Sequence, residues 1–244
     1  MQKLTVNRVV ALSPLPVLVL AAGLRAEAPA PFGQGKRVLY VNRSASKADA
    51  VDKKVTKRLR SLGFVVATAQ PMDPPSGLEG ADLVVIASGF SAKAVKGAYA
   101  DTPVPVVLSE SAILTDLGMT GPRQGVDWGE VAGSAQPSLN VVNAIHPLAA
   151  GLPKGPSTPF DGTPKLINWG KPASSAIVVA TLLDEPGKAA IFGYEKGAMM
   201  DGARRAPARR VFLFLNDDAF EQLNDVGLTV FDGAMAWAVG LPSR

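Results

Sequence analysis

The chain has 244 residues, of which 47% are apolar and 19% charged, with 24 glycines, 20 prolines, one histidine and no cysteine. This composition suits one globular domain with small additions, and it excludes disulfides, thiolate nucleophiles, cysteine-ligated zinc and iron–sulfur clusters. The net charge is +4, but the first 26 residues hold three basic residues and no acid, which leaves 22 basic and 21 acidic residues and a net charge of +1. Nucleic acid is therefore not an expected partner.

The first 26 residues have the order of a secretory signal peptide. Lys3 and Arg8 precede an apolar run from Val9 to Leu24, and small residues follow it. The run is short and contains two prolines, so no stable membrane span is expected. We expect cleavage near Ala26 or Ala28 and export to the periplasm or the extracellular space.

After a proline- and glycine-rich linker at 27–36, short β-rich runs alternate with helical ones over 37–244, which is typical of a single α/β domain with parallel strands. The predicted strands are Arg37–Val41, Phe64–Ala69, Asp82–Ala87, Val104–Leu108, Leu139–Val142, Leu166–Asn168, Ile177–Leu183, Ala189–Tyr194 and Val211–Leu215. The predicted helices are Lys47–Leu62, Ser91–Tyr99, Glu110–Leu117 and a closing helix that Asn224 caps and that ends at Val239. We expect surface loops at Thr120–Gln136 and Gly151–Pro164.

Several fragments, in order, carry a family resemblance: RVLYV, ADLVVIASGFS, PVVLSE, IHPLAAGL, AIFGYEKGAMM, ARRVFLFL and LTVFDGAMAWAVG. Together they resemble exported bacterial domains of the class I glutamine amidotransferase-like, flavodoxin-like superfamily, related to trehalose-utilisation-type (ThuA-like) proteins. The resemblance implies an open, mainly parallel sheet flanked by helices, in secreted proteins often associated with carbohydrate modules. Amidotransferases place a cysteine after a central strand, where this chain has Ser109, Glu110 and Ser111, so glutaminase activity is excluded.

Polar residues follow the predicted strands, and ligands of open α/β sheets bind outside the carboxyl ends of the strands. Candidate ligand-binding residues are Asn42, Ser88, Ser109, Glu110 and Ser111. Glu110 stands at the start of a predicted helix, where an acid either caps the free N–H groups with a hydrogen bond across the crevice or acts on a ligand.

His146 is the one imidazole of the chain and precedes Pro147. It is a candidate general base, but such a histidine more often hydrogen-bonds the backbone and fixes a turn. The four arginines of residues 204–210 are expected to lie in a solvated loop, with one of them paired to an acid such as Asp217 or Asp218. The two tryptophans at 128 and 169 could stack on a sugar or pack on the sheet.

Three functions remain open. The first is an exported, non-catalytic domain that binds a small polar ligand, with saccharides as the favoured class, at the carboxyl-end crevice. The second is a secreted sugar hydrolase or isomerase with Glu110 and His146 as its acid and base. The third is a protein-interaction scaffold that uses the loops at 120–136 and 151–164. No phosphate-binding glycine motif or calcium-loop spacing is present, so we expect neither a cofactor nor a metal.

Overall fold

The computed structural model describes residues 30–42, 50–71, 78–90 and 92–241. The predicted signal peptide lies outside these residues. The strands are β1 (Arg37–Val41), β2 (Val65–Ala69), β3 (Leu83–Ile86), β4 (Val106–Leu108), β5 (Trp128–Ala132), β6 (Leu139–Val141), β7 (Gly155–Ser157), β8 (Leu166–Gly170), β9 (Ile177–Leu182), β10 (Glu185–Tyr194) and β11 (Arg210–Leu213). The α-helices are α1 (Ala50–Ser61), α2 (Ala92–Val95) and α3 (Asp225–Ala238), with short 3-10 turns between strands.

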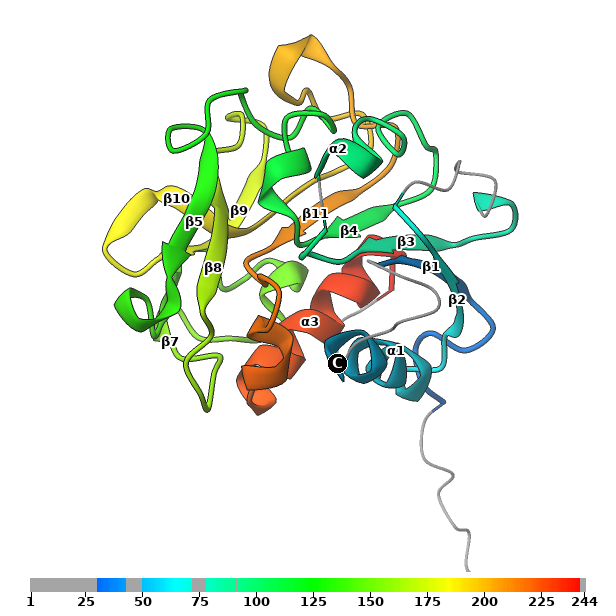
Figure 1. The fold of residues 1–244 in the computed structure, drawn as a ribbon, viewed down its shortest axis with the longest axis horizontal. Helices are drawn as coiled ribbons and strands as arrows, with labels where there is room; N and C mark the ends of the chain where they lie inside the picture. Colours follow the sequence, from blue (N-terminus) through cyan, green and yellow to red (C-terminus); the bar gives the residue numbers. More distant parts are fainter. Residues whose placement is uncertain (1–29, 43–49, 72–77, 91, 242–244) are drawn as a thin grey trace, which may run out of the picture.

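The sheet has a parallel half and an antiparallel half (Figure 1). Its order is β2-β1-β3-β4-β11-β10-β9-β6-β7, while β8 pairs with β10 and β5 pairs with β8. The first five strands of this order run parallel. With β11 as the fifth strand they have the 2-1-3-4-5 order of flavodoxin-like folds. The predicted α/β class, an open sheet flanked by helices, is therefore confirmed.

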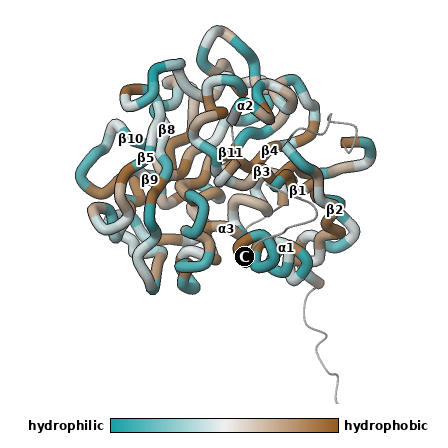
Figure 2. The backbone as a smooth tube through the Cα atoms, viewed as in Figure 1, coloured by the Kyte–Doolittle hydropathy of each residue, from teal (hydrophilic) through white to brown (hydrophobic). Residues whose placement is uncertain are grey.

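The parallel strands are buried on both faces, as continuous apolar runs predict. Tyr40 and Val85 face one apolar cluster, which α1 and α3 cover. Val41, Ile86 and Leu108 face a second cluster on the side of α2. Figure 2 shows these strands as the hydrophobic centre of the molecule, with polar residues along the outer side of α1. The crevice described below lies where the two covered faces meet at the strand ends.

The antiparallel half corrects several predictions. The expected loop at 120–136 contains β5, which pairs with β8, and the expected loop at 151–164 contains β7, which pairs with β6. These segments are glycine- or proline-rich, so their strand structure comes from pairing with neighbours rather than from local propensity.

Two predicted helices are much shorter than expected. Helix α2 has only four residues, because Lys96 adopts a positive φ of 43° directly after it. The expected helix at 110–117 is reduced to a 3-10 turn over Ser111–Ile113. The closing helix is confirmed, with the Asn224 side chain accepting a hydrogen bond from the Gly227 N–H at 3.1 Å.

Helices α1 and α3 are held together by an ion pair. The Arg58 guanidinium donates two hydrogen bonds to the Asp232 carboxylate, one of them from Nε to Oδ1 at 2.9 Å. Burial raises the pKa of Asp232, although the arginine opposes this shift. None of the helices in the described part of the chain combines the length and apolar character that crossing a bilayer requires.

Candidate functional site

The strand order places a crevice at the carboxyl ends of β1 and β3. The chain leaves β1 for β2 on one side, while β3 and β4 lie on the other, so the covering helices diverge at this point. Open α/β sheets bind ligands at such a switch point. Ser88 follows β3, Glu110 follows β4 and the pair Asn216–Asp217 follows β11. Polar residues that closely follow the parallel strands therefore line part of the crevice.

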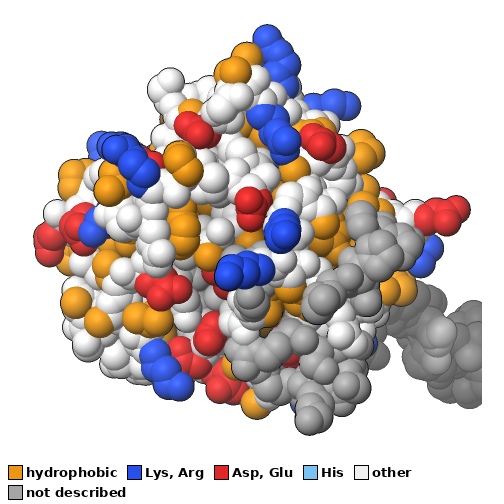
Figure 3. All heavy atoms as spheres, turned by 45° about the horizontal axis from the view of Figure 1, so that its top comes forward, with side chains coloured by type: hydrophobic (Ala, Val, Ile, Leu, Met, Phe, Trp, Pro, Cys, Tyr) orange, Lys and Arg blue, Asp and Glu red, His pale blue; other side chains and the backbone are white. Residues whose placement is uncertain are grey.

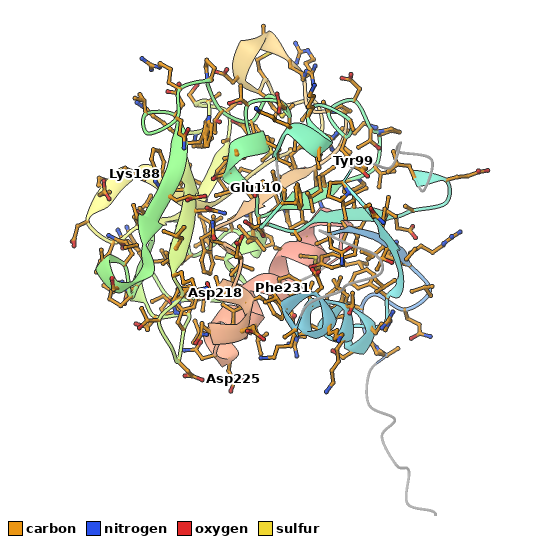
Figure 4. The ribbon with its side chains drawn as sticks, in the orientation of Figure 1. Tyr99, Glu110, Lys188, Asp218, Asp225 and Phe231 are labelled. Carbon is orange, nitrogen blue, oxygen red and sulfur yellow. The ribbon has the colours of Figure 1, made fainter. Side chains whose placement is uncertain are left out.

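Glu110 is the buried acid of the crevice, with 6% of its surface exposed (Figure 4). Its Oε1 accepts a hydrogen bond from the Ala112 N–H at 3.0 Å, so it caps the short turn that follows β4. Its Oε2 lies 3.4 Å from both the Ser88 hydroxyl and the Gly89 N–H, across the crevice. Both parts of the predicted capping role, the cap and the bond across the crevice, are thus present.

The electrostatic environment of Glu110 disfavours its charge. Burial raises the pKa of this carboxyl, the hydrogen bonds from Ala112 and Gly89 oppose the shift, and the nearby Glu130 adds to it. The Ser88 hydroxyl also lies 3.4 Å from Asp217 Oδ1. A hydroxyl has a single proton to donate, so it cannot satisfy both carboxylates at once.

A buried amide network supports the crevice from below. Asn168 on β8 is fully buried, and its Nδ2 donates to the carbonyls of Ser109 at 2.6 Å and Leu215 at 3.3 Å. Its Oδ1 accepts from Asn216 Nδ2 at 2.8 Å. Asn216 Nδ2 in turn reaches Glu130 Oε1 at 3.3 Å. The network thereby ties the carboxyl ends of β4 and β11 to β8 and orients the crevice side chains.

The crevice has two compartments. The outer one is an open cleft of about 720 Å³ on the α2 side, lined by Ser88, Gly89, Phe90, Glu110, Glu130, Leu166, Asn216 and Asp217 among others. The inner one is a pocket of about 50 Å³ on the α1 and α3 side. Ser88, Asn216 and Asp217 line both. Neither compartment has a lysine or arginine among its described lining residues.

The remaining predicted ligand-binding residues have different positions. Ser109 is half-buried and lines the inner pocket. Ser111 is fully buried, and its hydroxyl donates to Asn168 Oδ1 at 3.4 Å, so it supports the network. Asn42 is buried at the end of β1, and its side chain does not belong to the described lining of either compartment.

His146 lies near the amino end of β11, at the opposite end of the parallel strands from the crevice. Its ring stacks edge-on against Trp237 at 5.5 Å, and the Trp237 carbonyl accepts a hydrogen bond from Arg209, which directly precedes β11. This is the amino end of β11, whereas Glu110 follows the carboxyl end of β4. The structure therefore does not bring Glu110 and His146 together.

The role of His146 is local. Its Nδ1 accepts a hydrogen bond from the Leu148 N–H at 3.2 Å and caps a short turn. The predicted hydrogen bond to the backbone is therefore present, with the histidine as its acceptor. Burial lowers the pKa of the imidazole. The capped turn therefore favours neutral histidine with its proton on Nε2.

The arginine segment at 204–210 differs from the predicted solvated loop. Arg210 is fully buried, and its guanidinium donates to five backbone carbonyls, the closest being that of Thr102 at 2.7 Å. Burial lowers the pKa of Arg210 to about 10. Arg209 pairs with Glu195 rather than with Asp217 or Asp218. These arginines anchor chain segments, and Figure 3 shows basic and acidic side chains interspersed on the face it presents.

The two tryptophans belong to strands rather than loops. Trp128 begins β5 and is half-buried, and Trp169 on β8 is 3% exposed with the Lys188 ammonium 4.8 Å from its ring. Both tryptophans therefore pack on the sheet, which is one of the two predicted alternatives. Within the described ranges, no three histidine, aspartate or glutamate side chains are grouped so as to hold a metal ion.

Sequence reasoning missed Asn168, Asn216 and Glu130 as parts of the site. Asn216 has the signal that identified Ser88 and Glu110, because it follows closely after a parallel strand. That signal depends on knowing that β11 joins the parallel half. Asn168 and Glu130 come from the antiparallel half, where the position of a polar residue in the sequence gives no such indication.

Comparisons with known proteins found similarity among solved structures. No protein-family model matches the chain, and no curated protein sequence matches it either. Among solved structures, the chain is similar to a Thermoplasma acidophilum protein provisionally described as a subunit of GMP synthase, with a TM-score of 0.49 and 12% sequence identity. The match covers 81% of this chain and 91% of that one.

Proposed function

We propose that this protein is an exported, non-catalytic binding domain that takes a small, neutral or cationic polar ligand at the carboxyl-end crevice. The observation that carries the proposal is the outer cleft of about 720 Å³, whose described lining has three carboxylates, a hydroxyl and the two side-chain amides of Gln70 and Asn216, and no basic residue. Carboxylates accept hydrogen bonds and attract cations, while an anionic ligand would meet like charge at these described side chains.

Saccharides are the favoured ligand class. Their many hydroxyl donors match Glu110, Glu130 and Asp217, and amino sugars add a positive charge. The resemblance of the chain to exported amidotransferase-like domains, often associated with carbohydrate modules, supports the same choice. The separation of Glu110 from His146 leaves the acid–base alternative without an assembled pair.

A thermal-shift screen tests the proposal with neutral sugars, amino sugars and sugar acids. At about 100 times its dissociation constant, a ligand adds about 2.7 kcal/mol. For a domain of this size that is a rise of about 5–10 °C in melting temperature. We expect rises with neutral or amino sugars and none with gluconate or glucuronate. A flat response to every sugar, or a rise with the acids alone, contradicts the proposal.

Variants locate the site. Asp217→Asn and Glu130→Gln remove carboxylates on the exposed rim of the cleft, and each should weaken binding of an amino sugar more than binding of its neutral parent. Asp184→Asn is the matched control, because Asp184 is exposed in the turn between β9 and β10, away from the cleft. Equal effects of all three variants would argue against binding in the crevice.

A further inference from the structure

The inner pocket is the feature of the crevice that a purely polar ligand leaves unused. Its apolar lining includes Val51, Val55, Leu215, Phe220 and Phe231. They come from α1, α3 and the segment after β11. Ser88, Asn216 and Asp217 line the pocket where it meets the outer cleft. Its other polar lining residues are Ser109, Asp52 and Tyr40, and the Tyr40 hydroxyl donates a hydrogen bond to Asp52 Oδ1 at 2.7 Å. One molecule placed over the three residues shared with the outer cleft would reach both compartments.

The wall of the pocket is fixed by packing on several sides. Phe220 and Phe231 stack edge to face with their ring centroids 5.0 Å apart, and both are more than nine-tenths buried. Figure 4 shows Phe231 on α3, beneath the strands of the parallel half. The turn that carries Phe220 is linked to α1 by the Lys54–Glu221 ion pair at 3.1 Å. The pocket is therefore preformed and needs no large rearrangement to accept a ligand.

The size of the pocket sets the size of its occupant. A water molecule needs about 10–15 Å³ of such space. The pocket, at about 50 Å³, therefore has room for roughly three or four non-hydrogen atoms. A whole sugar ring is too large, whereas a short alkyl group fits. Its apolar wall favours such a group over water, because transfer of each buried CH₂ out of water is favourable.

We propose that the ligand is amphipathic, with a donor-rich polar part in the outer cleft and a short alkyl substituent of about three carbons in the inner pocket. This inference rests on the proposed function and narrows its ligand class. The polar part meets Glu110, Glu130 and Asp217, and the substituent passes the shared residues to lie against Phe220 and Phe231. The ligand thereby spans both faces of the sheet at the switch point.

Matched alkyl glycosides test the inference by isothermal titration calorimetry. The probes are the methyl, n-propyl and n-hexyl β-glycosides of glucose, galactose and glucosamine. Two additional buried CH₂ groups correspond to about tenfold in affinity. We expect n-propyl glycosides to bind about tenfold more tightly than methyl glycosides. We expect no comparable gain from n-propyl to n-hexyl, because the pocket is then full.

A pocket-filling variant gives a second measurement. Val51 is half-buried on α1 and lines the pocket, so Val51→Phe should fill it from the solvent side while the outer cleft stays intact. The n-propyl advantage should disappear and the methyl glycoside should bind as before. Val51→Ala is the control and should keep the advantage.

The outcomes separate this inference from the proposed function. Methyl and n-propyl glycosides that bind equally overturn the alkyl site and leave the polar site standing. An affinity that grows steadily to n-hexyl, or an n-propyl advantage that survives Val51→Phe, also overturns the alkyl site, because the gain then comes from another surface. If no glycoside binds, both proposals fail.

Discussion

Replacing Asn168 with leucine is the most direct test of how the crevice is supported. Asn168 is fully buried and joins β8 to the ends of β4 and β11 through its side-chain amide. Leucine has a similar volume but no polar atom. The Ser109 carbonyl then loses its 2.6 Å donor, at a cost of about 1–3 kcal/mol for a buried unsatisfied group. The bond to Asn216 contributes about 0.5–1.5 kcal/mol more.

The expected total is about 3 kcal/mol. At about 2–4 °C per kcal/mol for a domain of this size, the melting temperature should fall by about 6–12 °C, as measured by circular dichroism or calorimetry. Asn140→Leu is the matched control, because Asn140 is also a strand asparagine but is only half-buried on β6. Its effect should stay within about 0.5 kcal/mol. If both variants melt within about 2 °C of the parent protein, the amide network does not stabilise the crevice.

Three further predictions concern single side chains. Burial raises the pKa of Glu110, so ionisation of this carboxyl lowers the stability of the protein as pH rises through the folded pKa. Glu110→Gln should therefore melt at or above the melting temperature of the parent protein at pH 7. In calorimetric scans this difference should shrink below pH 4. Burial lowers the pKa of His146, so the contribution of the neutral imidazole to the free energy of unfolding is present above about pH 6.5 and is lost as pH falls below that value. In urea titrations, the free energy of unfolding should therefore fall less from pH 7.5 to pH 5 for His146→Gln than for the parent protein. Arg210→Met leaves several buried carbonyls without donors and should lower the free energy of unfolding by about 3 kcal/mol, whereas Arg205→Met, at an exposed position, should change it by less than about 0.5 kcal/mol in the same denaturation experiment.

The parallel half of the fold is readily predicted from the sequence, because local pattern and final environment agree there. Continuous apolar runs such as Leu83–Ile86 are buried on both faces, and Asn224 has both the residue type and the position of a helix cap. The antiparallel half lacks this agreement. β7 has the sequence Gly-Pro-Ser and forms a strand only because β6 supplies the neighbouring backbone.

The same contrast applies to the site. Ser88 and Glu110 can be predicted because they follow strands whose parallel arrangement is evident from the sequence, and both line the cleft. Asn168 cannot be predicted, because its position between β4 and β11 depends on how β8 crosses beneath the strand ends. Glu110 and His146 are both polar residues near turns, and the sequence gives no indication that they lie at opposite ends of the parallel strands.

Glu110 connects the stability of the crevice with the ligand class proposed for it. In the free protein its carboxylate is buried and lies near Glu130, and among the described residues its donors are two backbone N–H groups and the Ser88 hydroxyl, which also lies near Asp217. Burial and the neighbouring Glu130 make the ionised form costly, the existing donors offset only part of this cost, and further hydrogen-bond donors on a ligand would favour the ionised form. A ligand that donates hydrogen bonds to Glu110 then gains binding energy from a carboxylate whose charge the free protein stabilises poorly. An anionic ligand offers no such gain, which is the physical reason for expecting a neutral or cationic polar group to occupy the outer cleft.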